Sequence, residues 1–156
     1  MGQVVLLKNL ASALSEIRQG QKVVFTNGCF DILHIGHIKY LQEARSQGDL
    51  LVVGIDTDAS VRGLKGPTRP IQNEKDRSEI LAALSCVDYV CLFDEGDPRP
   101  LIKEVRPDVL VKGGDWEIDQ ILGSEFVMSY GGEVKSLQFI KGRSTTNIVD
   151  RILNKN

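Results

Sequence analysis

The chain has 156 residues, enough for one domain whose hydrophobic core needs neither disulfides nor a structural metal. Its 19 Lys and Arg residues nearly balance its 21 Asp and Glu residues, and a formal net charge of −2 favours neither nucleic acid nor an anionic membrane as a partner. The three cysteines show no disulfide-framework spacing and no apolar run reaches the length of a membrane span, so we expect a single domain over residues 1–156 in a reducing cytoplasm.

Predicted helices and strands alternate along the chain. In chain order they are a helix at 10–17, a strand at 23–25, a helix at 38–44, a strand at 50–55, a helix at 73–84, a strand at 89–93, a helix that begins at 97, a strand at 109–111, a helix at 124–130, a strand at 134–137 and a helix at 145–153. The polar stretch 56–72, rich in Gly and Pro, is predicted to be a loop, and Asn73 is predicted to cap the helix after it, with Ile80 on the inner side of that helix. This alternation predicts an α/β fold, a doubly wound parallel sheet of about five strands, with ligands outside the carboxyl ends of the strands.

The strongest chemical pattern is TNGCFDILHIGH at 26–37, between the first strand and the next helix. His34 and His37 are the two histidines of the chain, and they flank Gly36. Gly28 lets the chain turn off the strand, and Gly36 lets a phosphate approach the backbone closely. Because the following helix directs free N–H groups to the same place, the pattern predicts a triphosphate cradle whose imidazole donors stabilise the attacked α-phosphate.

The histidine pair is also compatible with a zinc site completed by Cys29 or Asp31, although the chain has no distant ligand cluster. A third possibility is that either histidine is an ordinary surface or core residue. The sequence leaves both alternatives open.

A second cluster, KGRSTT at 141–146, stands before the last helix and again joins a glycine, basic side chains and hydroxyls. Such a segment suits the β- and γ-phosphates of a nucleotide. Ser144 or Thr145 is equally compatible with an ordinary helix cap.

Three basic residues follow the second strand. Lys65 and Arg69 lie in the predicted long loop, which is typical of a lid or a substrate-binding element, and Arg77 lies on the next helix. The alternative is that the loop residues are only solvated and that Arg77 pairs with a helix neighbour.

The last pattern is VKGGDW at 111–116, at the end of the fourth predicted strand. Its two glycines permit close approach to a base or a sugar. We expect functional roles for Lys112 and Asp115, and a core position or a subunit contact for Trp116.

The segment GCFDILHIGH at 28–37 resembles the signature of the cytidylyltransferase-like superfamily. Its HIGH tetrapeptide is shared with class I aminoacyl-tRNA synthetases, but those are far longer and carry a KMSKS-type motif where this chain has GRSTT. Within the superfamily, the segments FTNGCFDILHIGH, GLKGPTRPIQNEKDR, LAALSCVDYV, VKGGDW and KGRSTTNIV are similar to D-glycero-β-D-manno-heptose 1-phosphate adenylyltransferases in their stand-alone form. Glycerol-3-phosphate cytidylyltransferases are the nearest relatives, but they usually have threonine at the place of Cys29 and tend to lack the lysine at 112.

The resemblance implies a Rossmann-like nucleotidyltransferase fold and direct, in-line transfer of AMP from ATP to a sugar 1-phosphate. It implies catalytic roles for His34, His37, Lys65 and Arg77. It implies nucleotide contacts at Thr26, Asn27, Gly28, Cys29, Phe30, His34, Gly36, His37, Gly113, Asp115, Gly142, Arg143, Ser144, Thr145 and Thr146. Sugar phosphate contacts are implied at Asp31, Lys65, Arg69 and Lys112. Mg²⁺ is expected on the triphosphate rather than on protein ligands, and a homodimer is expected by resemblance alone.

Two further functions remain open on the sequence. One is cytidylyl transfer from CTP to glycerol 3-phosphate or another polyol phosphate. The second is a module that binds a nucleotide without turning it over.

Overall fold

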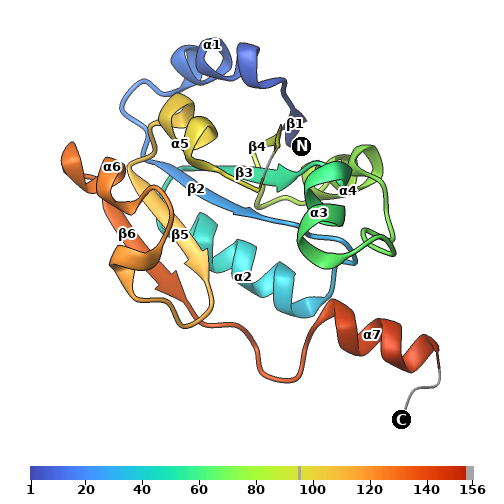
Figure 1. The fold of residues 1–156 in the computed structure, drawn as a ribbon. Helices are drawn as coiled ribbons and strands as arrows, with labels where there is room; N and C mark the ends of the chain where they lie inside the picture. The colour runs from blue at the N-terminus through green and yellow to red at the C-terminus, as the bar shows by residue number, and fades with distance from the viewer. Residues whose placement is uncertain (95, 154–156) are drawn as a thin grey trace.

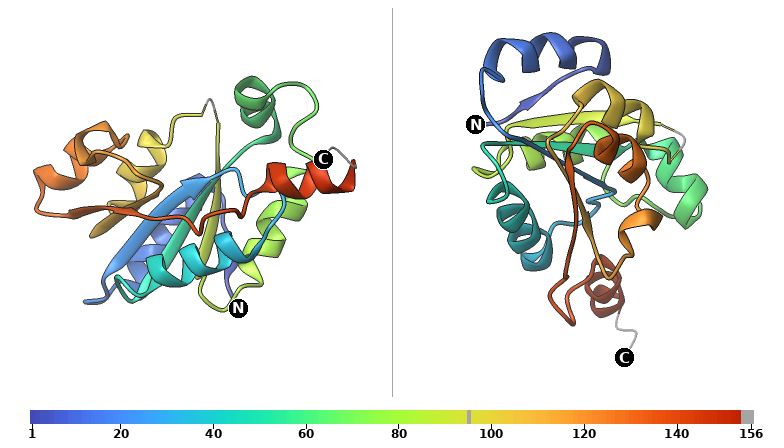
Figure 2. Two further views of the ribbon diagram at one scale, coloured as in Figure 1. Left: turned by 90° about the horizontal axis from the view of Figure 1, so that it is seen from below. Right: turned by 90° about the vertical axis from the view of Figure 1, so that its left-hand side faces the viewer.

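The computed structural model describes residues 1–94 and 96–153, so Glu95 and the last three residues of the expected domain lie outside the description. The chain forms a six-stranded parallel sheet in the order β1-β4-β3-β2-β5-β6, with helices on both faces (Figures 1 and 2). The strands are β1 (Gln3–Val4), β2 (Val23–Gly28), β3 (Leu50–Asp56), β4 (Tyr89–Phe93), β5 (Val109–Gly113) and β6 (Glu133–Leu137). The helices are α1 (Leu7–Ile17), α2 (Ile35–Arg45), α3 (Asp58–Lys65), α4 (Glu74–Ala82), α5 (Arg99–Val105), the short 3-10 helix η1 (Ile118–Gln120), α6 (Ser124–Ser129) and α7 (Thr145–Ile152).

The strands separate two apolar clusters, one on each face of the sheet. Phe25 of β2 is fully buried in one cluster together with Leu10 of α1 and Leu101 of α5. Its neighbour Val24 points to the other face, into a cluster with Leu41 of α2. Because both faces are covered, the central strands are continuous apolar runs, as the sequence predicts for a doubly wound sheet. The predicted fold class is therefore confirmed.

The structure differs from the predicted elements in three places, one of which is the short 3-10 helix η1 between β5 and α6. A sixth strand, β1, pairs with β4 through two residues only, Gln3 and Val4, which is too short to leave a sequence pattern. The predicted loop 56–72 contains helix α3, whose N-cap Thr57 accepts a hydrogen bond from the backbone N–H of Ser60 at 3.2 Å. The sequence does not reveal α3 because Ser60 and Val61 are its buried residues, and they form no apolar stripe.

The structure corrects two predicted side-chain positions. Trp116 is 46% exposed, which excludes the core position and leaves the subunit contact a prediction. Its indole N–H donates to the backbone oxygen of Gly113 at 3.1 Å. Ile80 is 38% exposed because the buried face of α4 runs through Arg77 and Leu81 instead. The predicted cap of the same helix is confirmed, since the Asn73 side chain accepts from the N–H of Asp76 at 2.9 Å.

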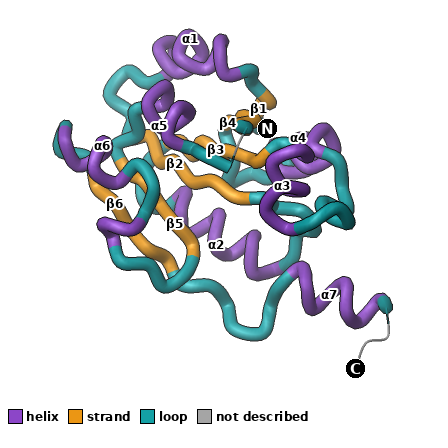
Figure 3. Tube along the Cα trace, in the orientation of Figure 1, coloured by secondary structure: helices purple, strands orange, loops and turns teal. Residues whose placement is uncertain are grey.

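The carboxyl ends of β2 and β3 point toward α3 and α7 (Figure 1). Figure 3 shows the long loop after β6 passing below α2 and entering α7 beside the loop that leads into α2. The hydroxyl of Thr145 fixes this approach by donating to the backbone oxygen of Ile32 at 3.1 Å. Two segments more than a hundred residues apart in sequence therefore meet at one edge of the sheet. None of the helices in the described part of the chain has the length and apolarity that a bilayer span requires.

Candidate active site

The loop between β2 and α2 is built around Phe30. Its φ of 47° lies in the left-handed region, which a bulky residue rarely adopts, and its side chain is 6% exposed. A Cβ on Gly28 would lie 3.0 Å from the Phe30 ring, so the glycine makes room for the ring as well as for the turn. The Phe30 ring also lies 5.3 Å from the ring of His37, measured between centroids. The strained loop thus forms a wall behind the second histidine.

His34 is held by the start of α2. Its Nδ1 accepts a hydrogen bond from the backbone N–H of Gly36 at 3.1 Å, so the histidine is the N-cap of this helix. In a neutral imidazole whose Nδ1 is an acceptor, the proton is on Nε2. His34 therefore has one N–H donor left for a ligand. A Cβ on Gly36 would lie 2.9 Å from the His34 ring, so the ring occupies the space that this glycine leaves.

His37 stacks on His34 with 3.9 Å between the ring centroids and 27° between the planes. Burial, His34 and Lys65 together lower the pKa of His37 to about 4. Burial and the charge of Arg143 also lower the pKa of His34. Both rings are consequently neutral at pH 7. Among the described residues, Nδ1 of His37 is a buried nitrogen without a hydrogen-bond partner, an exception of the kind that marks functional sites.

The segment before α7 forms a second wall. Arg143, Ser144 and Thr145 line a cavity of about 460 Å³ together with both histidines. Ser144 is the N-cap of α7, accepting from the N–H of Asn147 at 3.0 Å, so the helix-cap interpretation of this residue is confirmed. A cap does not prevent phosphate binding, because the helix N-terminus itself supplies donors for an anion. The phosphate contacts of the segment 142–146 stay a prediction.

Lys65 and Arg69 line the same cavity from the segment between β3 and α4. Lys65 is the last residue of α3 and is exposed, while Arg69 is half-buried and pairs with Asp31 at 2.7 Å. The structure thus brings together nine of the predicted residues in one cavity: His34, Gly36, His37, Lys65, Arg69, Arg143, Ser144, Thr145 and Thr146.

Asp31 is placed differently from the expectation of a substrate ligand. Its side chain is 1% exposed and accepts hydrogen bonds from Arg69 and from the backbone N–H groups of Ile71 and Gln72. Burial opposes ionisation, but the hydrogen bonds from Gln72, Ile71 and Arg69 outweigh it, so the pKa of this carboxyl lies below its ordinary value. Because its oxygens already accept these hydrogen bonds, the Asp31 carboxylate is a poor zinc ligand. This weakens the alternative in which Asp31 completes a zinc site with the two histidines.

Arg77 also differs from the expectation of a phosphate-binding residue. It is 1% exposed, and its guanidinium donates to the backbone oxygens of Gln72, Cys29 and Asp56 and to the carboxylate of Asp58. These bonds use four of its five N–H groups. Arg77 therefore ties the β2–α2 loop to the start of α3 from beneath the site.

A smaller cavity of about 180 Å³ adjoins the first. The predicted residues that line it are Asn27, Gly28, Cys29, Phe30, Asp31, His37, Lys65, Lys112, Gly113 and Thr145. Lys112 and Asn27 also line a third cavity of about 150 Å³ beside Trp116. Burial lowers the pKa of Lys112, although the charge of Asp56 opposes this. The lysine thus separates two hollows at the carboxyl edge of the sheet.

Three further predicted contacts lie apart from these cavities. Gly142 lines a separate hollow of about 430 Å³ together with His34 and Arg143. The Thr26 hydroxyl is fully buried and shares a hydrogen bond with the Tyr40 hydroxyl, so it faces the interior. Asp115 is exposed, beyond Gly114. The sequence patterns did not single out Phe139, which lines both cavities next to the histidines. Its place just after the carboxyl end of β6 is the signal that could have found it.

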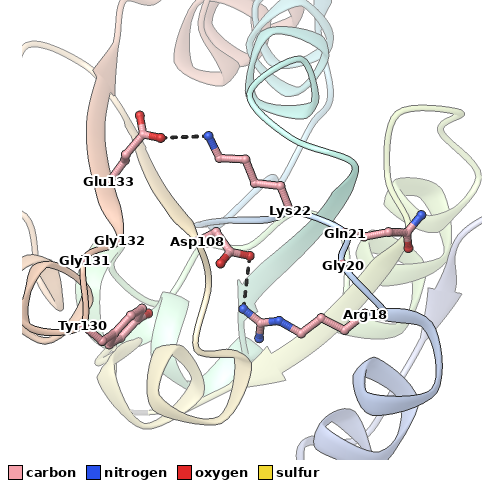
Figure 4. Close-up of a pocket in the computed structure, with 9 residues that line it drawn as sticks. All are labelled: Arg18, Gly20, Gln21, Lys22, Asp108, Tyr130, Gly131, Gly132 and Glu133. Carbon is pink, nitrogen blue, oxygen red and sulfur yellow. Dashed lines mark hydrogen bonds and ion pairs between the residues drawn. The ribbon is translucent and has the colours of Figure 1, made fainter.

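A hollow of about 490 Å³ lies at the opposite, amino-terminal edge of the sheet (Figure 4). Its charged side chains pair with one another, Arg18 with Asp108 at 3.1 Å and Lys22 with Glu133 at 2.8 Å. Because its charged side chains neutralise one another, this hollow offers a ligand less unpaired charge than the cavity lined by the histidines and basic residues. The carboxyl edge is therefore the better candidate for an active site.

The chain is similar to several known proteins. The model of the cytidylyltransferase-like family matches residues 25–151, which contain both segments predicted to bind phosphate. The bifunctional protein HldE of Syntrophotalea carbinolica is 59% identical over 140 residues, which are 90% of this chain and 29% of that protein. HldE of Geobacter sulfurreducens is 59% identical over 139 residues, 89% of this chain and 28% of that protein. The chain thus spans less than a third of these curated relatives.

Two solved structures are also similar. The crystal structure of the lipopolysaccharide core biosynthesis protein from Thermoplasma volcanium is 35% identical, with a TM-score of 0.63, and the match covers 80% of this chain and all of that one. Pantoate-beta-alanine ligase from Francisella tularensis, complexed with beta-gamma ATP and beta-alanine, has a TM-score of 0.62 at 18% identity over 99% of this chain and 77% of that one, which supports the fold alone. On the match over most of its length, this chain belongs to the cytidylyltransferase-like family.

Proposed function

We propose that this chain is a nucleotidyltransferase that transfers AMP from ATP to D-glycero-β-D-manno-heptose 1-phosphate, giving ADP-heptose and pyrophosphate. The observation that carries the transferase activity is the stacked, neutral pair His34 and His37 facing the Arg143 segment across one cavity. The heptose substrate is supported by the resemblance of the site segments to heptose 1-phosphate adenylyltransferases. The likeness to a lipopolysaccharide core biosynthesis protein supports a role of the product in a surface glycan.

The reaction needs positioning and charge neutralisation rather than a covalent enzyme intermediate. An oxygen of the sugar phosphate forms a bond to the α-phosphorus of ATP, and the bond from that phosphorus to the β-phosphate bridging oxygen breaks. The N–H groups of His34 and His37 donate to the α-phosphate, on which charge grows in the transition state. Arg143 and the N-terminus of α7 hold the departing pyrophosphate.

Mg²⁺ is the expected cofactor, and it neutralises part of the triphosphate charge when bound. The carboxylates beside the site fit an ion carried by phosphate oxygens, because protein donors already engage them. Asp31 accepts the hydrogen bonds described above, and Asp56 accepts from the Ser60 hydroxyl at 3.0 Å. No step of the transfer is assigned to a protein-bound metal. A cytoplasmic location and a homodimer complete the proposal.

The alternative within the same fold is cytidylyl transfer to glycerol 3-phosphate, and the remote one is nucleotide binding without turnover. The test is pyrophosphate release by the purified protein with Mg²⁺, with ATP and CTP each paired with heptose 1-phosphate and glycerol 3-phosphate. Release only with ATP and the heptose phosphate supports the proposal. Release only with CTP and glycerol 3-phosphate overturns the substrates but keeps the mechanism, and no release with any pair favours the binding module.

A further inference from the structure

The loop between α3 and α4 is fastened to the active site at one point, the carboxylate of Asp31. Oδ1 accepts from the backbone N–H of Ile71 and of Gln72, each at 2.9 Å, and Oδ2 accepts from Nε of Arg69 at 2.7 Å. The carboxylate is almost fully buried, so these bonds are not weakened by competing water. Asp31 therefore fixes both the backbone of the loop and the direction of the Arg69 side chain.

The bond at Nε leaves the outer edge of the Arg69 guanidinium available. Within the described residues, the Arg69 side chain makes one hydrogen-bonding contact, the one with Asp31. Arg69 is 17% exposed and lines the cavity that contains His34 and His37. A guanidinium held through Nε presents its two terminal nitrogens in a fixed plane, a geometry that suits two oxygens of one phosphate.

The basic residues of the cavity lie at two ends of the histidine pair. Arg143 belongs to the His34 end, because a Cβ on Gly36 would lie 3.3 Å from the Arg143 side chain and 2.9 Å from the His34 ring. Lys65 belongs to the His37 end, because these two residues line the small cavity together with Asp31. In an in-line displacement the attacking and the leaving oxygen lie on opposite sides of the phosphorus. If pyrophosphate leaves beside Arg143, the acceptor phosphate arrives at the other end.

We propose that Asp31 does not touch the substrate but positions Arg69 for the contact with the acceptor phosphate that the resemblance implies for this arginine. This inference rests on the proposed transferase function and adds the side of the site from which the acceptor attacks. Lys65, on the same side of the histidine pair, provides a second positive charge for the acceptor phosphate.

The test compares Michaelis constants for the two substrates in single variants. In Arg69→Gln the KM for the acceptor phosphate rises roughly tenfold to a hundredfold, the loss typical of a charged hydrogen bond, and the KM for ATP stays within about twofold. In Arg69→Lys the rise is smaller, because lysine keeps the charge but loses the planar fork. In Asp31→Asn the acceptor KM rises in the same direction, since the side chain that aims Arg69 has lost its charge.

The double variant Asp31→Asn/Arg69→Gln separates positioning from a general structural role. If Asp31 acts through Arg69, the acceptor KM of the double variant equals that of Arg69→Gln, because the two effects share one contact. Additive effects overturn the positioning role. Arg99→Gln is the matched control, since Arg99 also donates through Nε to a carboxylate, Asp97, at 2.8 Å but stands 58% exposed. This control leaves both Michaelis constants unchanged.

Each result also separates this inference from the proposed function. The variants are measured with the nucleotide and acceptor that the unmodified protein uses, be it heptose 1-phosphate or glycerol 3-phosphate. A rise confined to the acceptor KM supports the inference with either substrate pair. A rise in the KM for ATP alone, or a fall in kcat with both constants unchanged, overturns it while the transferase function stands.

Discussion

The proposed mechanism depends on the protonation state of two single residues, His34 and His37. The sequence places two imidazoles beside a helix N-terminus, and the structure adds that both are neutral at pH 7. His34 is locked with its Nδ1 as an acceptor from Gly36, so its Nε2 is the donor. Neutral donors stabilise the growing charge on a phosphate without holding the ground-state triphosphate too tightly.

The depressed pKa of His37 predicts how stability changes with pH. In the folded chain this pKa is about 4, and in the unfolded chain it returns to about 6.5, so only the unfolded chain takes up this proton in between. The free energy of unfolding therefore falls as the pH drops from 6.5 toward 4, by at most about 1.4 kcal/mol per pH unit for one proton. Urea unfolding at pH 7 and pH 5 measures this slope. His37→Gln flattens it, leaving the part due to His34, and an unchanged slope in this variant would contradict the assignment.

Gly36 gives the second prediction at a single residue. In Gly36→Ala the new methyl group displaces the His34 ring, with which it would overlap at 2.9 Å. We expect kcat to fall by roughly tenfold to a hundredfold, because small displacements of catalytic groups have effects of this size. The fold persists, since alanine favours a helix more than glycine does. Gly63→Ala on α3 is the control, because its Cβ meets nothing within 4 Å, and its kcat stays unchanged. Equal kcat values in the two variants would show that the His34 position is not critical.

At the scale of elements, the sequence predicts well what depends on apolar pattern and less well what depends on polar contacts. The five longer strands and the helices packed on them follow from buried runs and helical spacing. Helix α3 does not, because it is held by its Thr57 cap and by polar groups such as the Glu74 carboxylate, which accepts from the N–H of Asp58 at 2.7 Å. The contacts of Asp31 and Arg77 differ from expectation for the same reason. A charged residue near a site looks identical in sequence whether it binds the substrate or the loop beside it.

Arg77 connects three elements, and its removal tests this connection. Arg77→Ala leaves the backbone oxygens of Cys29 and Asp56 without a donor and the Asp58 carboxylate without its ion pair. We expect a loss of about 2–4 kcal/mol in the free energy of unfolding, together with low activity. Urea unfolding at pH 7 measures the loss, and Arg62→Ala, an exposed residue on α3, provides the reference. Full stability with a large fall in kcat would instead support the direct catalytic role that the resemblance implies.

At the scale of the whole molecule, the topology is what made the site predictable. Parallel strands end at one edge, so the segments after β2, β5 and β6 had to converge, and they do. The rule also accounts for Phe139, which follows β6 and which the sequence patterns did not single out. It gives no information about which side chains at that edge are already engaged, because partners such as Asp31 and Ile71 come from loops whose path no periodicity encodes.

The attachment of α7 to the rest of the molecule gives the last prediction. All eight residues of α7 are described and none is buried, and the helix stands out from the sheet in Figure 2. Its first residue, Thr145, bonds to the loop before α2, and Arg143 and Ser144 just before it face His34 across the cavity. A triphosphate that contacts both sides would link α7 to α2. Amide hydrogen exchange across 145–152 should therefore slow markedly when ATP and Mg²⁺ are added, whereas exchange in β2 and β3 stays at its already low rate.

Arg143→Gln is the variant that distinguishes this link from a general stabilisation. It removes a charge from an exposed side chain, so the free protein should keep its stability, but the slowing in α7 on addition of ATP should largely disappear. Asp150→Asn, on the later turns of the same helix, is the control and should retain the slowing. If α7 exchanges slowly before any nucleotide is added, contacts within the chain already hold it, and the phosphates are not what fixes this helix to the active site.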